Sequence, residues 1–132
     1  MAREILEIRD YTGEGYQPVI RFGAWRVAFL NSADRFRREN LCQLERHTET
    51  DETFTLLKGS AILYVSDGDA SHPGNISGVR LEPCKIYNVP VGVWHAIETG
   101  PDTSVMITEN NDTCPANTPK IPITPSMLPI VR

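Results

Sequence analysis

Residues 45–54 combine acidic side chains with one histidine, directly before an apolar run. The stretch reads ERHTETDETF and contains Glu45, His47, Glu49, Asp51 and Glu52. Imidazole nitrogen and carboxylate oxygen atoms are common protein ligands of transition-metal ions. The residue types therefore allow half of a metal site, and the alternative interpretation is a charged, solvated turn.

A second histidine, His95, opens an apolar stretch behind a turn. The segment 90–99 reads PVGVWHAIET, and its Pro-x-Gly turn leads into a predicted strand that begins at the histidine. A single histidine on an apolar strand is more often a hydrogen-bonded core residue than a ligand. Together with His47 and a carboxylate at a suitable spacing, it favours a shared site.

Two strands joined by a polar turn would bring the first group together. We expect a strand over residues 40–47, a four-residue turn, and a second strand over residues 52–57. Side chains alternate along a strand, so Glu45 and His47 share one face and Glu52 faces them from the next strand. If both faces point inward, a divalent cation would compensate the buried charges.

Short apolar runs separated by glycine, proline, asparagine and aspartate recur along the chain, which favours an all-β barrel or sandwich. No long helix is predicted, and residues 66–78 have the composition of a long hairpin loop. Further strands are expected at residues 24–30, 60–66, 85–89, 95–99 and 104–109.

Two charged residues on these strands are candidates for contact with a ligand. Arg26 lies on the strand face opposite Trp25, and its planar guanidinium matches a substrate carboxylate. Glu109, at the end of the last barrel strand, could serve as an acid or base. The alternatives are an exposed strand arginine and a surface carboxylate.

Length and composition limit the class of protein. The chain has 132 residues, enough for one domain with its own core, and we divide it into a barrel over residues 1–113 and a proline-rich extended arm over residues 114–132. We expect the apolar residues of this arm to pack across the barrel or onto a partner subunit. The net charge of -4 argues against nucleic acid as a partner.

Three features of the sequence bear on where in the cell the protein is found. No run approaches the length of a membrane span, and the N-terminal residues lack a secretory signal, so we expect no membrane association. The three cysteines, Cys42, Cys84 and Cys114, are widely spaced and are expected to be reduced thiols. A cytoplasmic location is predicted.

The two histidine segments resemble the two sequence motifs of the cupin superfamily of small β-barrels. The first motif, G-x5-H-x-H-x3,4-E-x6-G, is matched by His47, Glu52 and Gly59, and the second, G-x5-P-x-G-x2-H-x3-N, by Pro90, Gly92 and His95. The chain departs from these motifs where Glu45 replaces the first histidine, Cys84 the leading glycine and Thr99 the final asparagine. A rival alignment makes His47 the first histidine and Glu49 the second ligand, but it leaves too few residues before Glu52.

The resemblance implies a double-stranded β-helix, or jelly-roll, barrel that forms a homodimer. It also implies a divalent metal ion (iron, manganese, zinc or nickel) held by His47, Glu52 and His95, with Glu45 as a possible fourth ligand. The function implied is that of an enzyme of dioxygenase, isomerase or lyase type acting on a small polar or anionic metabolite. The alternative is a non-catalytic cupin that binds or senses a small molecule, with or without a metal ion.

Overall fold

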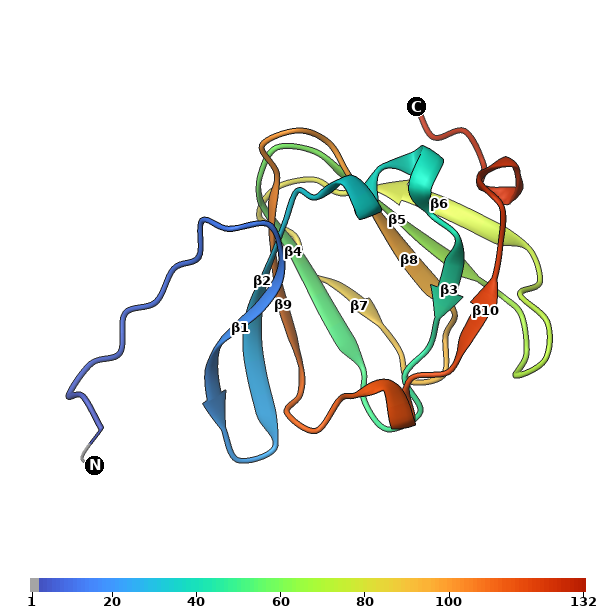
Figure 1. Cartoon of the computed structure of the whole chain (residues 1–132). Helices are drawn as coiled ribbons and strands as arrows, with labels where there is room; N and C mark the ends of the chain where they lie inside the picture. The colour runs from blue at the N-terminus through green and yellow to red at the C-terminus, as the bar shows by residue number, and fades with distance from the viewer. Residues whose placement is uncertain (1–2) are drawn as a thin grey trace.

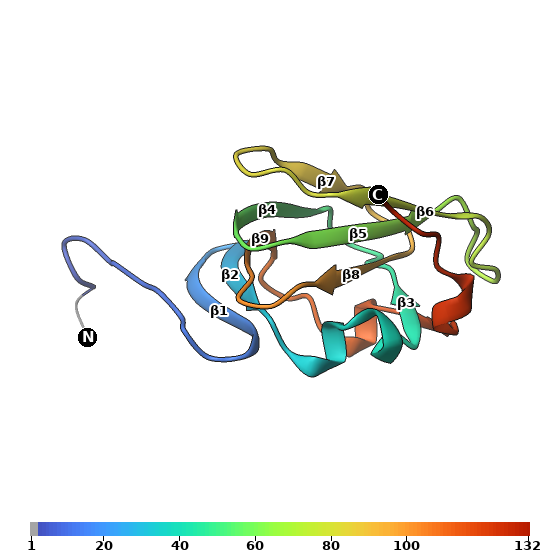
Figure 2. The ribbon, with the colours of Figure 1, turned by 90° about the horizontal axis from the view of Figure 1, so that it is seen from above.

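The computed structural model describes residues 3–132, which form two five-stranded antiparallel sheets that face one another (Figures 1 and 2). The first sheet has the strand order β1-β2-β9-β4-β7, and the second sheet has the order β10-β3-β8-β5-β6. From β2 onward the chain passes back and forth between the sheets, which is the winding of a jelly roll. The all-β fold class is therefore confirmed.

Each element is short. The strands are β1 Gly15–Phe22, β2 Trp25–Asn31, β3 Gln43–Glu45, β4 Glu52–Lys58, β5 Ala61–Ser66, β6 Ile76–Arg80, β7 Tyr87–Val89, β8 His95–Thr99, β9 Ser104–Asn110 and β10 Lys120–Pro122. Four single turns of 3-10 helix accompany them within residues 3–132: η1 Asp34–Phe36, η2 Arg38–Asn40, η3 Pro115–Asn117 and η4 Pro125–Met127. Among the described residues, no helix has the length and apolar character needed to cross a membrane.

All the strands predicted from the sequence are present, as β2, β3, β4, β5, β7, β8 and β9, although β3 and β7 are shorter than expected. The predicted hairpin loop over residues 66–78 is partly wrong, because its end belongs to β6, which pairs with β5. The turn-forming residues of this segment form β6 because they pair with β5. The absence of a side chain at Gly78 also lets the C-terminal tail pack closely against this strand. A Cβ added to Gly78 would come within 2.5 Å of the Val131 side chain.

The main hydrophobic core lies between the two sheets, and we call it the inner core. Its members include Phe54 and Leu56 from β4, Leu63 from β5 and Ile107 from β9. Strand alternation places Glu52 on the same face of β4 as Phe54, as predicted. It likewise places Arg26, Glu109 and His95 on the inward faces of their strands, which fixes where the site can form.

A second cluster, the outer core, covers the opposite face of the second sheet. It contains Leu41, Leu44, Ile62, Tyr64, Trp94, Ile123 and Leu128. The last two belong to the C-terminal tail, so residues on both faces of β5 are buried and its sequence AILYV is apolar throughout. Burial of these side chains stabilises the tail on its own barrel.

One arginine holds the tail in place. Arg38, in η2, donates hydrogen bonds to the carbonyl oxygens of Leu128 (2.7 Å) and Pro129 (3.0 Å) and to the Tyr64 hydroxyl (3.0 Å). The tail pairs with β3 through β10, and the Ile123 N–H donates to the Cys42 carbonyl at 3.0 Å. Beyond Ile123, where prolines supply no backbone N–H, its carbonyl groups and apolar contacts hold it to the barrel. Arg38 therefore fixes the end of the tail against the barrel.

Arg38→Ala is expected to lower the free energy of unfolding by about 2–3 kcal/mol, because the tail carbonyls and the Tyr64 hydroxyl lose a charged donor. Urea denaturation measures this change. The neighbouring Arg37→Ala, which alters an exposed side chain, is the matched control and should stay within about 0.5 kcal/mol of wild type. Equal losses in the two variants would contradict the proposed role of Arg38.

Candidate metal centre

Two turns at one end of the barrel position the histidines. The loop between β3 and β4 carries His47. The backbone carbonyl of His47 accepts a 2.7 Å hydrogen bond from the N–H of Gly92, in the turn before β8. Asp51 accepts a 2.7 Å bond from the Val91 N–H, which ties the same two turns together. Gly92 has φ +84°, a conformation that favours glycine. The motif glycine thus fixes the approach of the two loops.

The strand registers bring the remaining groups together in two rows. In the second sheet, Glu45 of β3 lies directly opposite His95 of β8. In the first sheet, Arg26 of β2 lies opposite Glu109 of β9. The β4–β9 register, in which Thr53 faces Thr108, puts Glu52 beside Glu109. The site is therefore built from both sheets.

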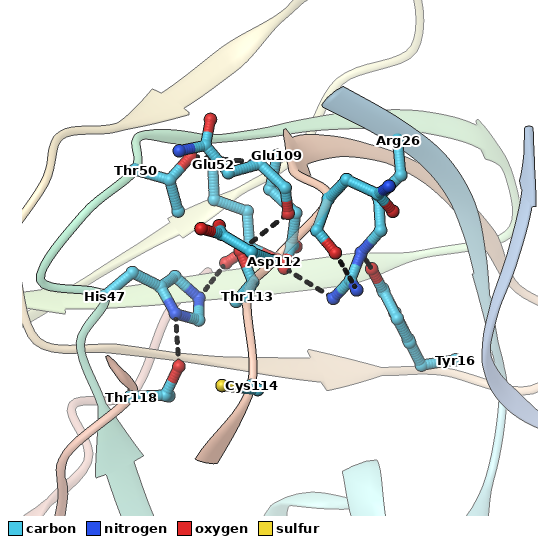
Figure 3. Close-up of polar contacts among 12 residues, drawn as sticks. Tyr16, Arg26, His47, Thr50, Glu52, Glu109, Asp112, Thr113, Cys114 and Thr118 are labelled. Carbon is cyan, nitrogen blue, oxygen red and sulfur yellow. Dashed lines mark hydrogen bonds and ion pairs between the residues drawn. The ribbon is translucent and has the colours of Figure 1, made fainter. Parts of the chain in front are cut away.

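Both histidines contact one carboxylate oxygen. The Nε2 atoms of His47 and His95 each lie 2.9 Å from Oε1 of Glu52. These three residues are 3–6% exposed. Figure 3 shows the His47 ring pointing at Glu52 across the space between the sheets. The sequence predicts this convergence, and the structure places all three side chains together.

The far nitrogen of each ring is also held. His95 Nδ1 lies 3.0 Å from the Val93 carbonyl oxygen, which can only accept, so Nδ1 carries a proton. His47 Nδ1 lies 2.9 Å from the Thr118 hydroxyl, which can accept from the ring while it donates to Asn117 Oδ1 at 3.4 Å. A neutral ring with its proton on Nδ1 would present the Nε2 lone pair to a metal ion, whereas without metal a proton on Nε2 can donate to Glu52.

The buried charges stabilise one another. Burial alone raises the pKa of Glu52, but hydrogen bonds from His47 and His95 outweigh it and lower the pKa below its ordinary value. Burial likewise lowers the pKa of His95, and the hydrogen bond and charge of Glu52 outweigh it and raise the pKa. Glu52 is therefore an ionised carboxylate, the form that binds a cation.

Glu45 sits at the edge of this group. Its Oε1 lies 4.0 Å from His95 Nε2, and its side chain is 38% exposed. One ligand atom each from Glu45, His47, Glu52 and His95 all lie within 4.8 Å of one another. Two imidazoles and two carboxylates fit a divalent transition-metal ion, because the carboxylates balance its charge.

A cavity of about 650 Å³ opens beside these residues. Arg26 lies on its wall and donates to the Tyr16 hydroxyl (3.0 Å), the Asn111 carbonyl (3.2 Å) and Glu109 Oε1 (3.1 Å), as Figure 3 shows in part. Its side chain is 12% exposed, so the structure does not place it as an exposed strand arginine. Three of its five N–H groups are used in these contacts.

Glu109 is buried and is not the surface carboxylate that its place at a strand end allows. Its Oε1 pairs with Arg26, whereas its Oε2 is buried without a hydrogen-bond partner. Burial, and then the adjacent Glu52 carboxylate, raise the pKa of Glu109 to about 9, against the opposing effect of Arg26. Glu109 also lines the cavity, which makes its carboxyl group a candidate for contact with a ligand.

Two residues of the site were not predicted from the sequence. Thr118 lies 71 positions after His47, within a proline-rich segment that has no local signal for a site. Tyr16 belongs to β1, which was not recognised as a strand. Only the fold brings either residue to the cavity.

Known structures share this fold. A cupin-2 domain protein from Shewanella frigidimarina is 15% identical over 76% of this chain and 85% of that chain, with a TM-score of 0.56. Hydroquinone 1,2-dioxygenase from Sphingomonas is 9% identical over 76% and 69% of the two chains, with a TM-score of 0.60. A variant of Streptomyces PAC13 is 12% identical over 95% and 100%, with a TM-score of 0.59.

The chain thus has the fold of the cupin superfamily, as its two motifs predict. The sequence matches no family model and no curated protein. At 9–15% identity, these structures establish the fold alone.

Thr118→Val is expected to lower the affinity for a divalent metal about tenfold, because the His47 ring loses the partner that orients it. Thr118→Ser keeps the hydroxyl and is expected to stay close to wild type. Competition with a chelating dye measures both affinities. If the valine variant changed only the melting temperature of the metal-free protein and left the affinity unaltered, the orienting role of Thr118 would be excluded.

Proposed function

We propose that the protein is a metal-dependent enzyme that acts on a small polar or anionic metabolite. The observation that carries this proposal is the convergence of two buried imidazole nitrogens on one buried carboxylate oxygen beside a cavity. A charged group shielded from water is costly unless it is compensated, and such groups concentrate at functional sites.

The proposed metal ligands are His47, Glu52 and His95, with Glu45 as a fourth, more exposed one. A divalent ion bound there supplies a Lewis acid for an oxygen atom of the substrate or, if it is iron, a centre for oxygen chemistry. The chain's own contribution is to hold the two rings by their Nδ1 atoms and to exclude water from Glu52.

The opposite wall of the cavity is proposed to bind the substrate. Arg26 has N–H groups left to donate to a carboxylate, and the Tyr16 hydroxyl beside it fixes the plane of the guanidinium. Glu109 lines the same cavity, and its carboxyl group could accept from a substrate hydroxyl or, when protonated, donate to a carbonyl. A cavity of about 650 Å³ suits a small molecule.

Proteins with a similar fold bind or act on small molecules. The Sphingomonas dioxygenase holds 4-hydroxybenzoate and the Streptomyces protein holds uridine. Others are an oxalate decarboxylase and a 3,4-ketoisomerase. For this chain we therefore propose a reaction of dioxygenase, isomerase or lyase type.

A non-catalytic binding or sensing protein is the second candidate. It is favoured by Glu45, which stands where the first motif has a histidine and leaves the site with two imidazoles. The location we propose is cytoplasmic, because Cys42, Cys84 and Cys114 are all free and exposed, as suits a reducing compartment.

The purified protein is expected to contain one divalent metal ion per chain by elemental analysis, and to melt at a higher temperature with metal than after chelation. His47→Ala is expected to lose the ion, because it removes a buried ligand. Glu45→Ala is expected to keep it with reduced affinity.

The matched control is His72→Ala, which removes a histidine whose side chain is 79% exposed on a distant loop. Metal content in this variant should equal that of wild type. A wild-type protein that binds no divalent metal would overturn the enzyme proposal and leave the non-catalytic one.

A further inference from the structure

The inward side chains of the barrel strands form layers. Side chains alternate along a strand, so a residue two positions from a charged one points to the same side. His95 is followed in this way by Ile97 on β8, and Glu52 by Phe54 on β4. The register of β4 against β9 places Phe54 opposite Ile107. The charged layer at one end of the barrel is therefore backed by an apolar layer.

The cavity of about 650 Å³ runs past both layers. Besides the charged residues of the candidate metal centre, its lining includes the apolar side chains of Leu30, Phe36, Phe54, Ile97 and Ile107. Leu30 lies four residues beyond Arg26 on β2, which is about 13 Å along an extended strand. The Phe54 ring lies edge-on to His95, with 6.0 Å between the ring centres, so the apolar layer begins directly beside the histidine.

A second guanidinium, that of Arg35 in η1, also lines this cavity. Its Cζ atom lies 4.6 Å from the centre of the Phe36 ring. A Cβ added to Gly15 would come within 3.2 Å of Arg35 Nη2, so the glycine leaves room for the guanidinium. Gly15 pairs with Asn31 at the end of β2, whereas Arg26 lies near the start of that strand. The two arginines therefore lie at different ends of the cavity.

The two guanidinium groups also differ in what they already contact. Arg26 donates to three groups of the protein. Arg35 is exposed, and within residues 3–132 its guanidinium makes no ion pair and no hydrogen bond. A guanidinium that lies over an aromatic ring keeps its N–H groups at its edge, where two of them can donate in parallel to one carboxylate. Arg35 is thus suited to bind an anionic group at the apolar end of the cavity.

We propose that the ligand of this cavity is a carboxylate with an apolar body. Its carboxylate binds Arg35, and its body lies against Leu30, Ile97 and Ile107. The inference rests on the proposed function in one respect, that the reacting group at the other end of the ligand lies at the candidate metal centre. A sugar acid, with hydroxyl groups along its whole length, is disfavoured because those groups would lose hydrogen bonds to water beside apolar side chains.

The test uses 4-phenylbutyrate as the probe and isothermal titration calorimetry on the full-length protein. The probe is expected to bind wild type more tightly than gluconate does, because gluconate is a carboxylate with a polar body. Arg35→Gln is expected to lower the affinity for 4-phenylbutyrate about tenfold, since a charged, paired donor is lost. The uncharged 4-phenylbutyramide is expected to bind wild type and Arg35→Gln equally.

Arg37→Gln is the matched control, because it removes an exposed arginine two positions away that lies outside the lining of the cavity. It should bind 4-phenylbutyrate as wild type does, and equal melting temperatures will show that both variants fold. The proposal is overturned if wild type does not bind the probe at millimolar concentration or binds gluconate as tightly. Equal affinities of wild type and Arg35→Gln for the probe would overturn it as well.

Repeating the titrations after chelation separates this inference from the enzyme proposal. An affinity for 4-phenylbutyrate that falls on chelation and is unaffected by Arg35→Gln would place the carboxylate on the metal ion, against the inference. An affinity that depends on Arg35 in a protein that binds no divalent metal would overturn the enzyme proposal alone and support the carboxylate site.

Discussion

A buried carboxylate sits between the two sheets, and its charge must be compensated. Glu52 belongs to the first sheet, whereas His95 opens β8 of the second sheet and His47 lies in the loop that joins β3 to β4. Removing one partner from a buried charged group commonly costs about 3–5 kcal/mol. The contacts between Glu52 and the two histidines therefore constrain how the sheets face one another. They also constrain the Gly92 turn and the register of β3 against β8.

Much of the fold follows from local patterns in the sequence. β4 and β8 show alternation between turn residues, and both were placed closely from sequence. β1 was missed because Pro18 interrupts it, and β6 because Gly78 resembles a turn residue. Each forms a strand only because a neighbouring strand supplies its hydrogen bonds. Partner strands distant in sequence have no signature within the segment itself.

The site, like the fold, could be predicted from the sequence only in part. His47 and Glu52 are separated by one turn, and the motif spacing sufficed to predict that they meet. His95 required the second motif as well. Thr118 could not be predicted, because its contact with His47 depends on where an edge strand brings the tail. Glu109 is buried because its side chain points inward from β9. At the end of a strand, no local sequence pattern shows in which direction a side chain points.

The position of the tail also sets an order of events during synthesis. A ribosome makes the N-terminal residues first, and the barrel strands β1 to β9 precede the tail. The His47 ring cannot adopt its final orientation until Thr118 has emerged, and the outer face of β5 stays uncovered until Leu128 has followed. A nascent chain halted between β9 and the tail therefore has both histidines but lacks the group that orients one of them.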